Sequence, residues 1–241
     1  MRYGIFSDIH SNLEALERVI EELETQKVDS YICLGDIVGY GANPNECVER
    51  VQGVAELCVA GNHDYGVLGK TTVDNFSGRA KEAVLWTQKI LKKKNREFLN
   101  GLPLTQKRDG TLFVHASPRD PESWIYLITM SEGMLAFVRF QEKICFVGHS
   151  HYPLIFTQGE KGFGYFQKES FVLSPETRYI VNVGSVGQPR DQDPRAAFTL
   201  YDTETQEVQI IRVPYDVETA QTKIRKAGLP PSLADRLAAG E

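Results

Sequence analysis

The sequence lacks the features of several protein classes. It has no apolar run long enough to span a bilayer, and residues 1–8 turn polar too soon for the hydrophobic region of a signal peptide. It also has no tandem repeat, low-complexity tract or linker-like run that would divide the chain. We therefore expect a soluble cytoplasmic protein with no membrane contact, folded as a single domain over residues 1–241.

The chain has little excess of either charge and few cysteines. Lysine and arginine number 27 against 32 acidic residues, a formal charge of -5, so no overall basic field favours nucleic acid as an obligatory partner. A local basic pocket would be invisible in that sum. The four cysteines lie in apolar stretches without C-x-x-C spacing, and we expect them to be reduced core residues rather than disulfides or zinc ligands.

Short apolar runs alternate with helical patterns along the first half of the chain. Each run is rich in aromatic and β-branched residues and predicts a buried strand. The predicted strands are residues 3–6, 31–34, 57–60, 112–114, 144–147 and 179–183. Most of them end at Gly, Asp, Asn or His.

Helical spacing is clearest over residues 11–24, where Ser11 and Glu14 form a candidate capping box. Further helices are predicted after Pro44 and over residues 77–92. The alternation favours parallel α/β architecture, in which ligands bind beyond the carboxyl ends of the strands. Residues 153–173 and 197–213 are expected to add antiparallel strands, the latter as a hairpin turning near Glu204.

All five histidines follow predicted strands, at strand ends where Asp and Asn residues also gather. The histidines and the acidic or amide residues at these strand ends are Asp8, His10, Asp36, Asn62, His63, Asp64, His115, His149 and His151. Taken singly, each motif is also typical of a turn, a helix cap or a core histidine. Their joint confinement to strand ends indicates one shared polar site.

Imidazole nitrogens and carboxylate oxygens together suit borderline divalent metals, and a single carboxylate can bridge two ions. Asp36 is the candidate bridge. The i, i+2 spacing within Asp8–His10 and within His149–His151 would direct both side chains of a pair to one side of extended backbone. Two metals about 3.5–4 Å apart can activate a water and stabilise an in-line displacement at phosphorus.

The ordered motifs resemble those of the calcineurin-like metallophosphoesterases, and in particular the compact bacterial and archaeal phosphodiesterase branch of that superfamily. They are Asp8-x-His10, Gly35-Asp36, Gly61-Asn62-His63-Asp64, His115 and Gly148-His149-x-His151. Residues 35–41 and 182–190 support the resemblance, which spans residues 1 to about 213. It implies an α/β fold in which two mixed β-sheets pack as a sandwich flanked by α-helices.

The resemblance also implies a binuclear centre of two divalent ions, for which Mn, Fe, Ni and Zn all suit the donors. The implied ligands are Asp8, His10, Asp36 and His151 for one ion, and Asp36, Asn62, His115 and His149 for the other. His63 would face the scissile phosphate and protonate the leaving oxygen or stabilise the transition state, with Asp64 orienting its ring. A hydroxide that bridges the metals would attack phosphorus directly, without a covalent phosphoenzyme.

The implied substrate is a small, possibly nucleotide-like, phosphate ester, either a diester or a monoester. A dinucleoside polyphosphate hydrolase and a protein phosphatase-like enzyme are alternatives, and nuclease activity is disfavoured by the net acidity. A non-catalytic scaffold for protein partners is the alternative from another class. His63 discriminates against it, because an enzyme that has lost its activity typically loses that residue.

The chain is longer than minimal members of the resembled branch. We expect helical insertions at about residues 65–110 and 119–140 that overhang the metals and select the substrate, and a C-terminal extension of two short helices at about 214–241. Arg119 and Arg190 are candidate substrate contacts. Trp124 and Tyr126 are candidates for part of a lid.

Overall fold

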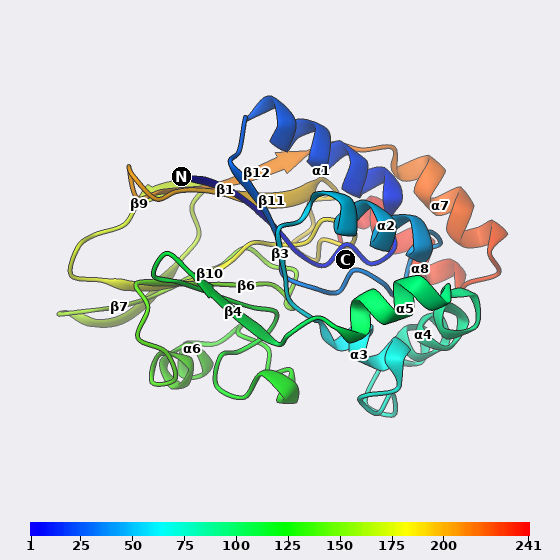
Figure 1. Ribbon diagram of the computed structural model, residues 1–241, viewed down its shortest axis with the longest axis horizontal. Coiled ribbons are helices and arrows are strands. Elements are labelled where there is room, and N and C mark those ends of the chain that lie inside the picture. The colour runs from blue at the N-terminus through cyan, green and yellow to red at the C-terminus, as the bar shows by residue number, and fades with distance from the viewer.

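Two six-stranded mixed sheets form the centre of the computed structural model, which describes all 241 residues (Figure 1). The first sheet has the order β3-β2-β1-β11-β12-β9, parallel across β3, β2 and β1 and antiparallel elsewhere. Its strands are β1 (Arg2–Phe6), β2 (Ser30–Cys33), β3 (Leu57–Cys58), β9 (Ser170–Val172), β11 (Ala196–Asp202) and β12 (Glu207–Val213).

The second sheet has the order β4-β5-β6-β10-β7-β8. Its central strands β5, β6 and β10 run parallel, and β4, β7 and β8 add antiparallel edges. The strands are β4 (Thr105–Arg108), β5 (Thr111–Val114), β6 (Ile144–Val147), β7 (Ile155–Gly159), β8 (Gly162–Phe166) and β10 (Arg178–Asn182).

Helices cover the outer faces of both sheets. Helix α1 packs on β11 and β12 of the first sheet, and α6 packs on β7 and β8 of the second (Figure 1). The helices are α1 (Leu13–Thr25), α2 (Pro44–Val54), α3 (Asn62–Leu68), α4 (Gly78–Ile90), α5 (Lys93–Asn100), α6 (Met130–Phe137), α7 (Val217–Lys226) and α8 (Pro231–Ala239). A short 3₁₀ helix also spans Pro121–Ser123. No helix has the length and apolar character needed to cross a membrane.

Alternation along the strands builds the core on both faces of each sheet. In β1, Tyr3 and Ile5 face the second sheet and join one buried cluster with Phe113 and Phe146, whereas Phe6 joins a separate cluster beneath α1 and α2. Successive side chains of a strand point to opposite faces, which explains the division. The predicted sandwich of two mixed sheets flanked by helices is confirmed.

Most of the predicted elements are present, with three differences. Helix α1 is capped by Asn12, whose Oδ1 accepts a hydrogen bond from the Ala15 amide at 3.2 Å, and not by Ser11, whose Oγ is buried without a partner. Strand β4 and helix α3 have no counterpart among the predicted elements. β4 is an edge strand of polar residues, so it lacks the apolar alternation that identifies a strand.

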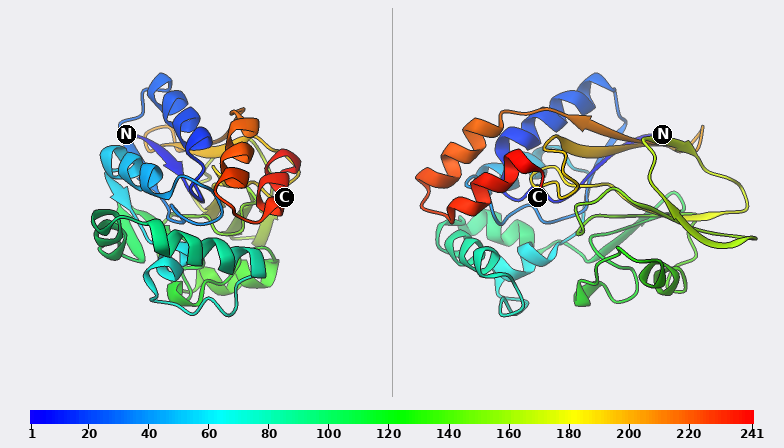
Figure 2. Two further views of the ribbon diagram at one scale, coloured as in Figure 1. Left: turned by 90° about the vertical axis from the view of Figure 1, so that its right-hand side faces the viewer. Right: turned by 180° about the vertical axis from the view of Figure 1, so that it is seen from behind.

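The helices at one end of the sandwich come from distant parts of the chain. The predicted C-terminal helices are present as α7 and α8, and Figure 2 shows them beside α1 and above α4. Ile224 and Leu233 of this pair share a buried cluster with Tyr40 and with Ala80 of α4. The four cysteines are buried and free, as expected.

Phe146→Ala tests the contact between the two sheets. Phe146 of β6 is fully buried, and its ring lies 6.0 Å from that of Phe113 and 5.4 Å from that of Tyr201 on the opposite sheet. We expect the free energy of unfolding to fall by about 3–5 kcal/mol in urea denaturation, because a large cavity replaces the ring. The control Val172→Ala, at a side chain 63% exposed, should change it by less than about 0.5 kcal/mol. An equal effect of both changes would contradict this packing.

Candidate metal centre

The predicted polar residues lie at one edge, where the carboxyl ends of strands from both sheets meet. Asp8 and His10 follow β1, Asp36 follows β2, and Asn62 opens α3 just after β3. From the second sheet, His115 follows β5, and His149 and His151 follow β6. All seven side chains are less than a tenth exposed, so they face one another rather than solvent.

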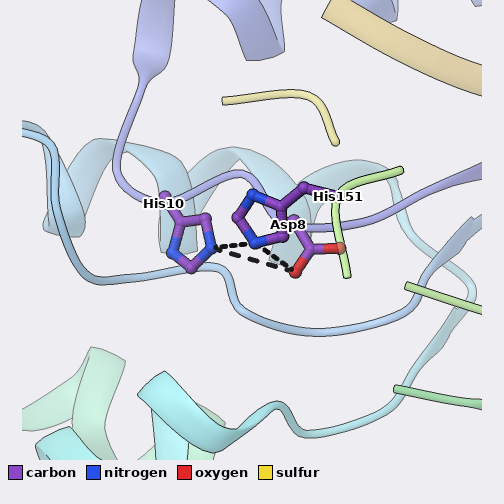
Figure 3. Close-up of side chains that lie close together, drawn as sticks. All are labelled: Asp8, His10 and His151. Carbon is purple, nitrogen blue, oxygen red and sulfur yellow. Dashed lines mark hydrogen bonds and ion pairs between the residues drawn. The ribbon is translucent and has the colours of Figure 1, made fainter. Parts of the chain in front are cut away.

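Asp8, His10 and His151 form the first group of potential metal ligands (Figure 3). His151 Nε2 lies 3.2 Å from Asp8 Oδ1 and 3.1 Å from His10 Nε2. His10 Nε2 also lies 3.6 Å from Asp36 Oδ2. One ligand atom of each residue therefore points at a common position.

Asp36, His115 and His149 form a second group. His115 Nε2 lies 3.4 Å from Asp36 Oδ2 and 3.3 Å from Asn62 Oδ1. Asp36 Oδ2 thus faces histidines of both groups at 3.4–3.6 Å, and Asp8 Oδ1 lies 3.9 Å from His115 Nε2 as well as 3.2 Å from His151 Nε2. This is the geometry expected of a carboxylate between two metal positions.

The second ring nitrogen of each histidine ligand is held by the backbone of a neighbouring loop. His10 Nδ1 lies 3.2 Å from Val38 O, His115 Nδ1 lies 2.8 Å from Leu34 O, and His151 Nδ1 lies 2.5 Å from Gln188 O. His149 uses Nε2 instead, at 2.8 Å from Trp124 O. Because each ring donates one N–H to a carbonyl, its second nitrogen is directed to the centre with a free lone pair.

The two carboxylates are anchored in the same way. The His149 amide donates to Asp8 Oδ2 at 2.9 Å, and the His63 amide donates to Asp36 Oδ1 at 2.8 Å. Asp8 Oδ1 remains buried without a hydrogen-bond partner. One oxygen of each carboxylate is thereby left for the centre.

The residues fit a divalent cation on electrostatic grounds. Burial lowers the pKa of His10 and of His151, so both rings are neutral near pH 7 and present lone pairs that face each other at 3.1 Å. Two acceptors at that distance repel unless a cation lies between them. At His115, burial opposes protonation, but the charges of Asp36 and Asp8 outweigh it and raise the pKa to about 10. A cation can take the place of that proton.

Backbone strain marks the same residues. Asp8, His10, Asp36, His149 and His151 all have φ between 50° and 67°, in the left-handed region. The extended backbone expected at the two i, i+2 pairs is therefore wrong, and His149 and His151 point to different ligand groups. Non-glycine residues rarely adopt this conformation, and it persists where the surrounding structure holds it for function.

Two glycines allow the loops to approach this closely. A Cβ at Gly61 would clash with the carboxylate and amide of Asp36, and a Cβ at Gly148 would clash with Ser7 Oγ and Asp8 Oδ2. Any side chain at either position would displace a carboxylate of the centre.

His63 lies beside the ligands, and with His10 and Asp36 it forms a third group whose ligand atoms lie within 4.8 Å of one another, but its ring makes no hydrogen bond. Its ring is packed between those of His10, Tyr40 and Phe76, at 4.7, 4.5 and 4.9 Å between centroids. Its Nδ1 is buried without a partner, which leaves Nε2 as the nitrogen open to the adjacent cavity. Burial lowers the pKa of the ring to about 4, against the opposing charge of Asp36.

Asp64 has a different role from the one expected. Its Oδ1 accepts hydrogen bonds from the amides of Ile37 and Val38 at 3.0 and 3.2 Å, and its Oδ2 accepts one from the Gly61 amide at 3.0 Å. The structure has no hydrogen bond between Asp64 and the His63 ring. Asp64 therefore holds the loop after β2 against the start of α3 and does not orient the ring directly.

A cavity of about 410 Å³ opens beside His63, Asn62 and His149. Trp124, Tyr126 and Arg190 line it, as the sequence led us to expect, but Arg119 does not. The Tyr126 ring stacks on that of His149 at 3.9 Å.

The sequence did not identify several other lining residues, among them Tyr40, Phe76, Arg79 and Arg236. Tyr40 belongs to the segment 35–41 that supports the resemblance, whereas Phe76, Arg79 and Arg236 stand outside every motif, and no pattern in the sequence brings them to the site.

The two expected insertions contribute unequally to the surroundings of the site. Helix α4, within residues 65–110, supplies lining residues, and so do residues 123–126. In contrast, α6 packs on the second sheet, and α5 packs on α2 and α3. Only parts of the two segments therefore border the cavity.

Comparisons with known proteins agree with the fold and identify the family. A family model described as a calcineurin-like phosphoesterase superfamily domain matches residues 1–206. An uncharacterized protein of Methanocaldococcus jannaschii is 43% identical over 241 positions, covering 98% of this chain and 97% of that protein.

Two crystal structures match over the full chain. A metallophosphoesterase from Sphaerobacter thermophilus has a TM-score of 0.87 at 40% identity, covering 100% of this chain and 99% of that one. A hypothetical protein from Pyrococcus horikoshii OT3 has a TM-score of 0.79 at 22% identity, covering 100% and 98%, and shares the fold.

Gly61→Ala tests the packing of the centre. The new methyl group displaces the Asp36 carboxylate, and we expect the affinity for Mn²⁺ to fall roughly 10- to 100-fold in calorimetric titration, the range found when support of a ligand is lost. Gly53→Ala is the matched control, because a Cβ at this position in α2 meets no atom within 4 Å. Unchanged affinity in Gly61→Ala would show that Asp36 is not a ligand.

Proposed function

Since this chain belongs to the calcineurin-like phosphoesterase superfamily and is a metal-dependent phosphoester hydrolase, we propose that it cleaves small phosphodiesters or phosphomonoesters at a binuclear metal centre. The observation that carries the proposal is the convergence of anchored ligand atoms from both sheets on two adjacent positions, with Asp36 Oδ2 between them. Two divalent cations, when bound, supply an activated water and neutralise negative charge on the phosphate.

The proposed ligand sets follow from the two groups. Asp8, His10 and His151 hold one ion, Asn62, His115 and His149 hold the other, and Asp36 serves both. All the donors are imidazole nitrogens or side-chain oxygens, a set that suits Mn, Fe, Ni or Zn. The backbone anchors fix which nitrogen of each ring binds, so that the centre is preorganised before a metal arrives.

His63 is the proposed catalytic residue for the leaving group. It lies next to the ligands, its amide is tied to Asp36 Oδ1, and its Nε2 is open to the cavity. Burial keeps the ring neutral, but an anionic phosphate beside it raises its pKa again, because opposite charges favour the protonated form. The proton on Nε2 then stabilises or neutralises the leaving oxygen.

The proposed metal stoichiometry can be measured directly. Metal-free protein titrated with Mn²⁺ in a calorimeter should bind two equivalents, and His115→Ala should bind one equivalent tightly, because it loses a donor of one ion only. His63→Ala is the matched control and should retain two equivalents, since His63 is not a proposed ligand. A parent that binds a single equivalent would contradict the binuclear centre.

Turnover tests the role of His63. Metal-reconstituted protein is assayed with bis-p-nitrophenyl phosphate and p-nitrophenyl phosphate beside His63→Ala at equal metal content. We expect kcat to fall about 10²- to 10⁴-fold on loss of the acid group. A His63→Ala variant as active as the parent would remove His63 from the mechanism, and a fully loaded parent that cleaves neither ester would favour the scaffold.

A further inference from the structure

The cavity beside the proposed metal centre is strongly cationic, although the chain as a whole is acidic. Three arginines line it, namely Arg79 of α4, Arg190 of the segment after β10, and Arg236 of α8. No aspartate or glutamate is among its lining residues. The charge therefore does not follow from the net balance of -5 over the whole sequence.

These three arginines have no anionic partner in the protein. None of them takes part in an ion pair, and Arg79 and Arg236 make no side-chain hydrogen bond. Arg190 donates from Nη2 to the Tyr40 hydroxyl at 3.3 Å and to Gln188 Oε1 at 3.2 Å, while its Nε is buried without a partner. Guanidinium groups held at such a site leave their donors free for a ligand.

The charged form of Arg236 is disfavoured by its surroundings when no anion is bound in the cavity. Burial and the positive charges of Arg190 and Arg79 lower the pKa of Arg236 to about 10. By contrast, Arg225 of α7, which forms the C-terminal helical hairpin with α8, pairs with Asp235 of α8 at 2.8 Å outside the cavity. Like charges gathered in one cavity repel each other, and a multiply charged anion relieves that repulsion.

The arginines share the cavity with the proposed catalytic groups. Arg190 borders the centre, because its amide donates to the carbonyl of His151 at 3.3 Å and its Nη2 donates to the hydroxyl of Tyr40, whose ring packs on that of His63. Arg79 and Arg236 come from helices that converge through the buried cluster of Ala80, Ile224 and Leu233. A phosphate cleaved beside His63 would therefore leave room for a further anionic group between α4 and α8.

We propose, resting on the function above, that Arg79, Arg190 and Arg236 form a subsite for a second phosphate group, so that the preferred substrates are polyphosphorylated small molecules. Arginine pairs with phosphate oxygens through its planar fork, and several arginines suit the charge of a phosphate chain. Helix α8 lies beyond residues 1–206, the part matched by the family model, so the C-terminal hairpin adds this preference to the shared metal chemistry.

Binding of inorganic tripolyphosphate to metal-free protein tests the subsite independently of catalysis. By calorimetry, the parent should bind tripolyphosphate more tightly than orthophosphate. Arg79→Met and Arg236→Met should each weaken tripolyphosphate binding roughly ten-fold or more, the loss expected for one charge-assisted hydrogen bond. Arg225→Met is the matched control, because it removes the same charge from the same hairpin and should bind tripolyphosphate as the parent does.

Three results would overturn the subsite. They are a parent that binds tripolyphosphate no tighter than orthophosphate, cavity variants that bind it as the parent does, and an equal loss in Arg225→Met. Thermal unfolding of each variant shows whether it is folded, and two independent cavity variants keep the test decisive if one of them is not.

Inhibition of the metal-loaded enzyme tests whether tripolyphosphate binds in the cavity where the reaction takes place. At constant free Mn²⁺, tripolyphosphate should compete with bis-p-nitrophenyl phosphate. In Arg236→Met, the ratio of the inhibition constant of tripolyphosphate to that of orthophosphate should rise about ten-fold. Non-competitive inhibition would place the anion outside the reaction cavity and overturn the proposal. A parent without turnover would contradict the hydrolase, whereas the binding of tripolyphosphate to metal-free protein would still decide the subsite.

Discussion

The geometry of the site depends on how the histidine and aspartate ligands are held: one polar atom of each side chain binds backbone, and the other is left for the centre. His10 is held by Val38 O, and Asp8 is held by the His149 amide. The first bond joins the loops after β1 and β2 within one sheet, and the second joins loops that belong to different sheets. The two sheets must therefore keep a fixed spacing, and the packing of Phe146 against Tyr201 supplies it. The core of the sandwich thus serves the geometry of the site as well as stability.

This constraint also explains the unusual backbone at the site. A ligand that binds backbone with one atom and faces the centre with the other has little freedom in its own main chain, and Asp8, Asp36 and His149 all adopt left-handed φ values. Such conformations cost about 1–3 kcal/mol each, which the surrounding structure must offset. Gly61 and Gly148 contribute by leaving room for the two carboxylates.

Much of the arrangement can be predicted from the sequence, because it follows from local patterns. The apolar runs before Asp8, Asp36 and His115 identify strands, and parallel strands bring their carboxyl ends together. The polar strand β4 and the cap Asn12 were missed, since the first lacks periodicity and the second depends on geometry that Ser11 could equally have provided. Side-chain partners such as those of Asp64 could also not be predicted from the sequence, because three backbone amides from two different loops donate hydrogen bonds to its carboxylate.

The three arginines of the cavity show most clearly which residues come together only through tertiary packing and cannot be predicted from a sequence pattern. Arg79, Arg190 and Arg236 are far apart in the sequence and belong to no shared motif, and the acidic total of the chain does not reveal a local basic pocket. They meet because α4 and α8 bury apolar side chains in one cluster at the end of the sandwich. A cationic cavity in an acidic protein is thus a property of helix packing, and the same packing places it beside the proposed metal ligands.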